Sequence, residues 1–172
     1  VLVTDHLKQK VENNREVLNI IKTKDDKPWF KDEAGEYWRM YEFVKDSISL
    51  EQANEETLRE SGIAFGKFQQ RLADFPANSL VETIPRFHDT PNRYKNFHKV
   101  LNSDIRGRAK NAKKEIEFYL SREEYAHTLV DLQAAGELKQ RVTHNDTKLN
   151  NVLFDRATRK ALCVVDLDTV MP

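Results

Sequence analysis

At 172 residues, the chain is long enough to form one domain with a sizeable hydrophobic core. Its 28 Lys and Arg residues balance 28 Asp and Glu residues, which argues against nucleic acid as the main partner, because proteins that bind nucleic acid usually carry a basic excess. No apolar stretch approaches the length of a membrane span and no signal peptide opens the sequence, so we expect a cytoplasmic protein without a membrane partner.

The N-terminal part of the chain predicts a helix followed by a β-hairpin. Apolar residues at helical spacing favour a helix from residue 1 to about residue 14. The β-branched run VLNIIKT, residues 17–23, and the aromatic-rich run YWRMYEFV, residues 37–44, predict two strands. Pro28 and Gly35 lie in the turn-forming sequence between these runs, so we expect the strands to pair as a hairpin.

Helices are predicted for most of the middle of the chain. Residues 50–72 form a helical pattern, with an apolar side made of Leu58, Ile63, Phe65, Phe68 and Leu72. A long connection with three prolines follows, and Asp89 or Thr90 is suited to cap the next helix. Three further helices are predicted at residues 92–101, 109–120 and 122–138.

Short β-type runs complete the chain, at residues 141–144, 151–155 and 161–166. The last two flank the turn DRATRK and predict a second hairpin. The single cysteine, Cys163, lies within the last run, where we expect it to be a buried small hydrophobic residue. The predicted fold class is therefore α+β, mostly helical.

The polar stretch VTHNDTKLNNVLFD, residues 142–155, has the spacing of a phosphoryl-transfer loop. His144, Asp146 and Asn151 follow the pattern H-x-D-x-x-x-x-N, and Lys148 stands two positions after the aspartate. The hairpin would return the chain so that Asp166, at the end of the last strand, lies beside Asn151. Because Asn and Asp are also ordinary turn formers, a purely structural role is the alternative.

Each of these residue types suits one part of ATP-dependent phosphoryl transfer. Asp146 can orient the attacking hydroxyl and accept its proton, while Asn151 and Asp166 offer the hard oxygen ligands that Mg²⁺ prefers. Lys148 can reach the γ-phosphate as a point charge. For His144 we expect hydrogen bonds that brace the loop, with no direct action on the substrate.

The stretches HNDTKLNNVLFD and VVDLDTVMP resemble the aminoglycoside phosphotransferase and choline kinase superfamily. Within it, the chain is most similar to the bacterial N-acetylhexosamine 1-kinases, a likeness that extends to FHDTPNRY and YWRMYEFV. That family uses Mg-ATP to phosphorylate the anomeric C1 hydroxyl of N-acetylglucosamine or N-acetylgalactosamine. The resemblance thus implies ATP and Mg²⁺ as cofactors, and a nucleotide and a sugar as binding partners.

The resemblance also assigns roles to individual residues. It implies that Asp146 is the catalytic base and that Asn151 and Asp166 are Mg²⁺ ligands. Asp168 is a weaker metal candidate, since it could instead support the metal indirectly or cap the turn. The backbone of Glu42, Phe43 and Val44 would form the hinge that runs past adenine, so these three are the predicted cofactor-binding residues.

The fold that the resemblance implies is a partial protein-kinase-like fold. Residues 1–45 would be the remnant of the N-terminal lobe, with the helix, the hairpin and the hinge. Residues 46–172 would be an incomplete helical C-terminal lobe, with the catalytic loop at 142–155 and the metal-binding strand end at 161–168. No glycine-rich phosphate loop occurs in the chain, so we expect a middle fragment of a longer enzyme. Alone it would be inactive or very weak, and it would self-associate through exposed apolar surface.

Other functions stay open at the level of sequence. Asn145 replaces the arginine that precedes the catalytic aspartate in protein kinases, and Leu167-Asp168 replaces their Phe-Gly, which favours a small-molecule kinase. The acceptor could be choline, homoserine or an aminoglycoside rather than a sugar. A nucleotide-binding domain that has lost catalysis is the alternative from another class, although the loop residues it would have lost are present.

Overall fold

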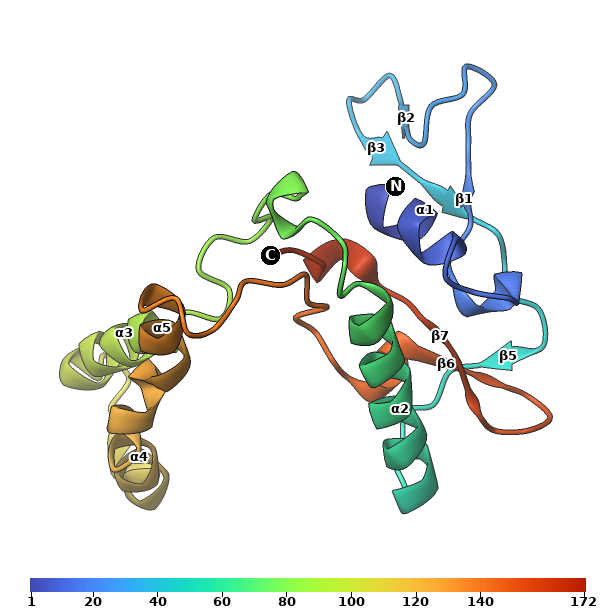
Figure 1. The fold of residues 1–172 in the computed structure, drawn as a ribbon. Helices are drawn as coiled ribbons and strands as arrows, with labels where there is room; N and C mark the ends of the chain where they lie inside the picture. The colour runs from blue at the N-terminus through green and yellow to red at the C-terminus, as the bar shows by residue number, and fades with distance from the viewer. The chain divides into compact units, whose positions relative to one another are not determined.

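Residues 1–172 form two compact units in the computed structural model (Figure 1). The first unit combines Val1–Thr83 with Arg141–Pro172, and the second is Ile84–Gln140, inserted between these two segments. The units contain five α-helices and several short sheets, which confirms the α+β class. None of the helices is both long enough and apolar enough to span a membrane.

The first unit begins with a short helix, α1 (Leu2–Lys8), which is shorter than predicted. A 3₁₀ turn, η1 (Asn14–Glu16), follows it, and the side chain of Asn13 accepts a hydrogen bond from the backbone N–H of Arg15. Because asparagine side chains offer the backbone such local bonds outside a helix, the predicted continuation to residue 14 was wrong.

The predicted N-terminal hairpin is confirmed, although it consists of two short ladders. Strand β1 (Ile20–Ile21) pairs antiparallel with β4 (Met40–Tyr41), and β2 (Phe30–Lys31) pairs antiparallel with β3 (Tyr37–Trp38). The Trp29 and Tyr37 rings contact each other near the tip, with centroids 5.4 Å apart. This contact between Trp29 and Tyr37 joins the two sides of the hairpin.

A three-stranded antiparallel sheet forms the centre of the first unit. Its strands lie in the order β5 (Ser47–Ile48), β6 (Val152–Asp155), β7 (Ala161–Val164). The β6–β7 hairpin was predicted, whereas β5 was not, because two residues leave no readable pattern of alternation. Pairing of Ser47 with Asp155 joins the segment that follows the N-terminal hairpin to the C-terminal hairpin.

Helix α2 (Glu55–Arg71) packs against β7, and Figure 1 shows it running beside the β6–β7 hairpin. It begins with a capping box between Asn54 and Thr57. Of the predicted apolar side, Phe68 and Leu72 are buried and Phe65 is half-buried. These residues connect the helix to the core.

The other two members of that apolar side were predicted wrongly. Leu58 is 57% exposed and Ile63 is 37% exposed. The first half of α2 instead turns Glu60 toward the sheet, where its carboxylate accepts a hydrogen bond from the backbone N–H of Ala161 and pairs with Lys160. A partnered carboxylate thus takes the place that the apolar pattern gave to leucine and isoleucine.

Two clusters of buried residues form the core of the first unit. One comprises Val3, Leu7, Val17, Phe68, Leu72, Val142 and Val170. The other comprises Leu18, Val44 and Cys163. Cys163 is buried, as predicted. Burial raises the pKa of its thiol to about 12, so the thiol stays protonated.

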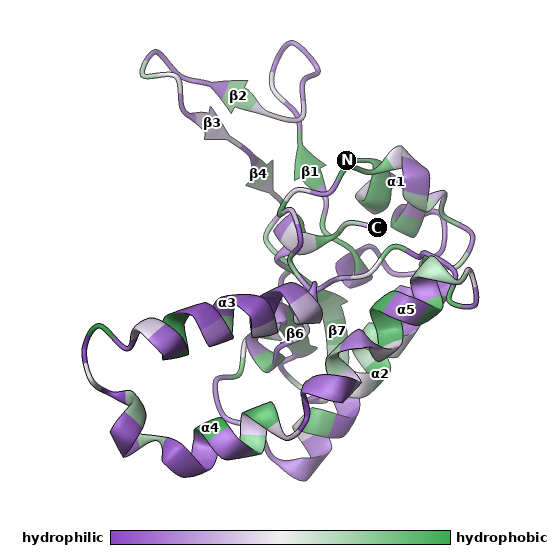
Figure 2. Cartoon of the chain, turned by 90° about the vertical axis from the view of Figure 1, so that its left-hand side faces the viewer, coloured by the Kyte–Doolittle hydropathy of each residue, from purple (hydrophilic) through white to green (hydrophobic).

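The second unit is helical. Its elements are α3 (Thr90–Ser103), η3 (Ala109–Asn111), α4 (Lys113–Leu120), η4 (Glu123–His127) and α5 (Thr128–Ala134). As predicted, Asp89 caps α3 by accepting from the backbone N–H of Asn92. Figure 2 shows hydrophilic and hydrophobic residues interspersed along α3 and α4.

The predicted helix at residues 122–138 is not continuous. Its first part, η4, is a 3₁₀ helix, and α5 ends at Ala134. Gly136 follows with φ of 76°, the left-handed conformation that commonly ends a helix. The pattern therefore predicted a helical segment at the right place in the chain. It missed the change from 3₁₀ to α-helix and the end of the helix before Gly136.

Candidate active site

The predicted phosphoryl-transfer residues lie at one end of the β6–β7 hairpin. In the antiparallel register Val152 pairs with Val164, and the backbone N–H of Val165 donates to the carbonyl of Asn151 at 2.9 Å. This pairing places Asn151, at the start of β6, next to Asp166, which follows β7. The adjacency predicted for these two residues is therefore present in the backbone.

His144 is buried behind this end of the hairpin. The backbone N–H of Asp146 donates to its Nδ1 at 3.3 Å. Because Nδ1 accepts, the ring proton belongs on Nε2, which lies 2.9 Å from the carbonyl of Val165 and donates to it. The ring also meets Phe65 and Phe68 edge-on, with centroids 5.3 and 5.8 Å apart. His144 thus connects the catalytic loop to the strand end that carries Asp166.

Two residues with left-handed backbones shape the loop, Asn145 with φ of 65° and Asp166 with φ of 59°. Asn and Asp tolerate this conformation better than other side chains with a Cβ. The amide of Asn145 donates to the carbonyl of Thr169 at 3.0 Å, and the hydroxyl of Thr169 donates to the carbonyl of His144 at 2.6 Å. These two bonds hold the catalytic loop to the segment that follows Asp166. No sequence pattern predicted that Thr169 takes part.

Asp146 is the centre of a small polar cluster. Its Oδ2 lies 2.7 Å from Nζ of Lys148 and 3.1 Å from Nδ2 of Asn151, which also donates to the Asp146 carbonyl at 2.9 Å. The ion pair with Lys148 is the main reason that the pKa of Asp146 is lowered, and the same contact raises the pKa of Lys148. At neutral pH the carboxylate is ionised and fixed in orientation, so it is suited to accept a hydrogen bond from a hydroxyl group.

The donor set at Asn151 and Asp166 fits a magnesium ion. The amide nitrogen of Asn151 is engaged by Asp146, which leaves its Oδ1 as a neutral oxygen ligand. The carboxylate of Asp166 forms no hydrogen bond or ion pair in the structure, and its charge acts on Lys148. No cluster of three His, Cys, Asp or Glu side chains could hold a metal by itself. Mg²⁺ commonly binds one or two carboxylates and completes its shell with water and substrate phosphates.

Asp168, the weaker metal candidate, forms an ion pair with Arg39, which lies between β3 and β4. This contact raises the pKa of Arg39, and the Arg39 guanidinium also lies over the Tyr41 ring, 5.5 Å from its centroid. A metal would have to compete with Arg39 for the carboxylate. No sequence signal points to this pair, whose members are separated by 129 positions.

The three predicted hinge residues differ in their surroundings. The backbone N–H of Glu42 donates to Asn19 at 2.8 Å, and the carbonyl of Val44 accepts from the Ser47 hydroxyl at 2.6 Å. No hydrogen bond of the structure uses the backbone N–H or C=O of Phe43, whose side chain is 81% exposed. Of the three residues, Phe43 is therefore best placed for a backbone contact with a base.

The comparison with protein families gives one result. Residues 5–172 match the phosphotransferase enzyme family. The match includes every predicted site residue and all of the first unit except residues 1–4.

Proposed function

The chain belongs to the phosphotransferase enzyme family, and from this premise we propose that it transfers the γ-phosphoryl group of Mg-ATP to the C1 hydroxyl of an N-acetylhexosamine. Family membership implies a kinase-like fold and a phosphotransferase activity, for which ATP and Mg²⁺ are the usual cofactors. The sugar acceptor is the finer part of the proposal. It is supported by the stretches VTHNDTKLNN, DLDTVMP and FHDTPNRY, whose sequences resemble the N-acetylhexosamine 1-kinases.

The observation that carries the proposal is the cluster of Asp146, Lys148 and Asn151 at the end of the hairpin. In the proposed reaction the ionised carboxylate of Asp146 accepts a hydrogen bond from the sugar hydroxyl and points its oxygen at the γ-phosphorus. As the new O–P bond forms and the bond to the ADP oxygen breaks, Asp146 takes the hydroxyl proton. Its lowered pKa makes it a weak base, so its main contribution is orientation, as expected for a loose phosphoryl-transfer transition state.

Lys148 and the oxygen pair of Asn151 and Asp166 would act on the phosphates. The contact with Asp146 keeps Lys148 protonated, and its Nζ would present a positive charge to the γ-phosphoryl oxygens. Mg²⁺, when bound, neutralises charge on the phosphates. Asn151 and Asp166 would hold it, and His144 would fix the distance between the two through its bonds to the loop and to Val165.

The test is ATP consumption by the natural protein at its full length, over a panel of N-acetylhexosamines, choline, homoserine and aminoglycosides. We expect turnover with N-acetylglucosamine or N-acetylgalactosamine. Asp146→Asn should lower kcat/KM by about 10²–10⁴-fold, the range of a positioned acid–base group. The matched control is Asp26→Asn, which makes the same change at an exposed turn residue and should leave turnover unaltered.

The outcomes separate the parts of the proposal. Turnover confined to another alcohol would retain the kinase but remove the sugar. Full activity in Asp146→Asn would remove the role of Asp146. No ATP consumption with any acceptor would overturn the proposed activity.

A further inference from the structure

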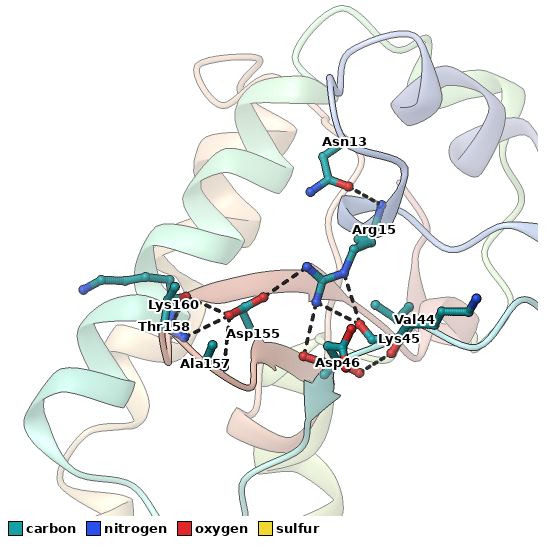
Figure 3. A network of polar contacts seen from close by, with 10 residues as sticks. Asn13, Arg15, Val44, Lys45, Asp46, Asp155, Ala157, Thr158 and Lys160 are labelled. Carbon is teal, nitrogen blue, oxygen red and sulfur yellow. Dashed lines mark hydrogen bonds and ion pairs between the residues drawn. The ribbon is translucent and has the colours of Figure 1, made fainter.

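Arg15, in the 3₁₀ turn before β1, contacts two distant parts of the first unit with one guanidinium group (Figure 3). Its Nε and Nη2 donate to the carbonyl of Lys45 at 3.1 and 2.8 Å, and Nη2 also lies 3.2 Å from the carbonyl of Asp46. Its Nη1 forms an ion pair with Oδ2 of Asp155 at 3.0 Å. Three acceptors from two chain segments are thus held by one planar side chain.

The two segments are those that the proposed function places around ATP. Lys45 and Asp46 directly follow the predicted hinge, residues 42–44. Asp155 ends β6, the strand that begins just after Asn151. Arg15 therefore bonds both to the residues that follow the hinge and to the end of the strand that follows Asn151.

Asp155 provides a fixed anchor for this contact. Its Oδ1 accepts from the backbone N–H groups of Ala157 and Thr158 and from the Thr158 hydroxyl, at 3.1, 2.9 and 3.0 Å. The two bonds from Thr158, followed by those from Arg15 and Ala157, lower the pKa of Asp155. Since Oδ1 is fixed by its own turn, only Oδ2 is directed at the guanidinium.

On the hinge side, the carbonyl of Asp46 is also held by a second donor. Asp46 has a left-handed backbone, with φ of 52°, and its carbonyl also accepts from the backbone N–H of Arg156 at 2.8 Å. Its neighbour Ser47 pairs with Asp155 in the sheet. Arg15 thus adds to existing contacts between the two segments, and its loss would loosen the hinge rather than unfold it.

We propose that Arg15 is a positioning residue for nucleotide binding. It fixes the position of the hinge backbone relative to β6, the strand that follows Asn151. The inference rests on the proposed function, because it assumes that Phe43 and its neighbours meet the adenine base. In this role Arg15 acts through the backbone that follows the hinge, by its bonds to the carbonyls of Lys45 and Asp46. Its effect is on ATP affinity, through the position of the Phe43 backbone, and the phosphoryl-transfer step is left almost unchanged.

The decisive substitution is Arg15→Lys in the full-length natural protein. Lysine keeps the charge that faces Asp155 but lacks the planar fork that reaches both carbonyls at once. We expect the KM for ATP and the dissociation constant for Mg-ATP, measured by calorimetry without acceptor, to rise about five- to tenfold. The value of kcat at saturating ATP and the KM for the acceptor should stay within about twofold of wild type.

Arg71→Lys is the matched control. Arg71 forms an ion pair of similar exposure with Glu16, the neighbour of Arg15 in the same 3₁₀ turn, but it contacts no hinge residue. A purely structural role would make both variants lose melting temperature and active fraction, with kcat falling and the KM for ATP unchanged. That result, or an unaltered ATP affinity in Arg15→Lys, would overturn the proposal.

Calorimetry also separates this inference from the proposed function. If wild type binds Mg-ATP but turns over no acceptor, the proposed activity fails, while weaker binding by Arg15→Lys still supports the positioning role. If wild type binds no nucleotide, both proposals fail.

Discussion

The two units of the molecule use side chains in different ways. In the first unit, polar residues lie inside: His144 and Asn151 are almost fully buried, and no buried side-chain nitrogen or oxygen lacks a hydrogen-bond partner. In the second unit the main buried side chain is Tyr94, and apolar residues such as Phe118 and Leu129 remain exposed. The difference indicates that precise positioning is concentrated in the first unit, where the predicted chemistry lies.

The largest effect is expected from a pair of phenylalanines, one in each unit. Phe68→Ala removes a side chain that is 5% exposed and contacts His144, and should cost about 3–5 kcal/mol of unfolding free energy. Phe118→Ala removes one that is 61% exposed and should cost under about 1 kcal/mol. Denaturant unfolding measures the loss of unfolding free energy in each variant. For Phe68→Ala, hydrogen exchange should assign the loss to β6 and β7. Equal costs would remove the contrast between the units.

A smaller effect is expected inside the second unit. The hydroxyl of Tyr94 donates to the carbonyl of Tyr119 at 2.8 Å, and the rings of these two tyrosines are stacked with their centroids 4.2 Å apart. Tyr94→Phe removes only this bond and should cost about 0.5–1.5 kcal/mol. Hydrogen exchange of α3 and α4 would detect it, with Tyr125→Phe as the exposed control. No change in Tyr94→Phe would mean that the stack alone holds these helices.

The smallest effect on stability concerns the ion pair of Asp146 and Lys148. The folded pKa of Asp146 is lowered, so its contribution exists above the ordinary Asp pKa of about 4 and is lost as the pH falls through the folded value. The folded pKa of Lys148 is raised, so its contribution exists below about 10.5 and is lost as the pH rises through the folded value. Both side chains are partly exposed, so solvent screens the ion pair and its contribution to stability is small.

Carboxyl NMR titration tests the direction of this shift. Asp146 should titrate below the ordinary value in wild type and move upward in Lys148→Gln. Lys22→Gln, which breaks an exposed ion pair in the hairpin, is the control and should leave Asp146 where it was. An Asp146 pKa that is the same in wild type and in Lys148→Gln would show that the two groups do not interact in solution.

Local patterns predicted the parts of the site that are close in sequence. The spacing of Asp146 and Asn151, followed by two apolar runs, was enough to place both residues at the end of a hairpin next to Asp166. Turn and cap residues were equally readable, as with Asp89 before α3. Such features depend on interactions within a turn or between strands that a short turn joins, which propensity and periodicity describe.

The contacts that were missed depend on the tertiary fold. Arg15 and Asp155 are 140 positions apart, and nothing in either neighbourhood marks them as partners. The exposure of Leu58 also depends on the tertiary fold. Glu60 faces the sheet because it bonds to Ala161 on β7, and Leu58 is left on the exposed side of α2. The roles of the site residues and the division into lobes at residue 45 stay predictions.

The insertion of Ile84–Gln140 into the first unit has a consequence for synthesis on the ribosome. The second unit is complete once residue 140 has emerged, whereas β5 must wait for β6, which lies more than 100 positions later. The early part of the first unit therefore leaves the exit tunnel with Ser47 and Ile48 unpaired. Until β6 arrives, this segment is an open edge on which a chaperone or a neighbouring nascent chain can act.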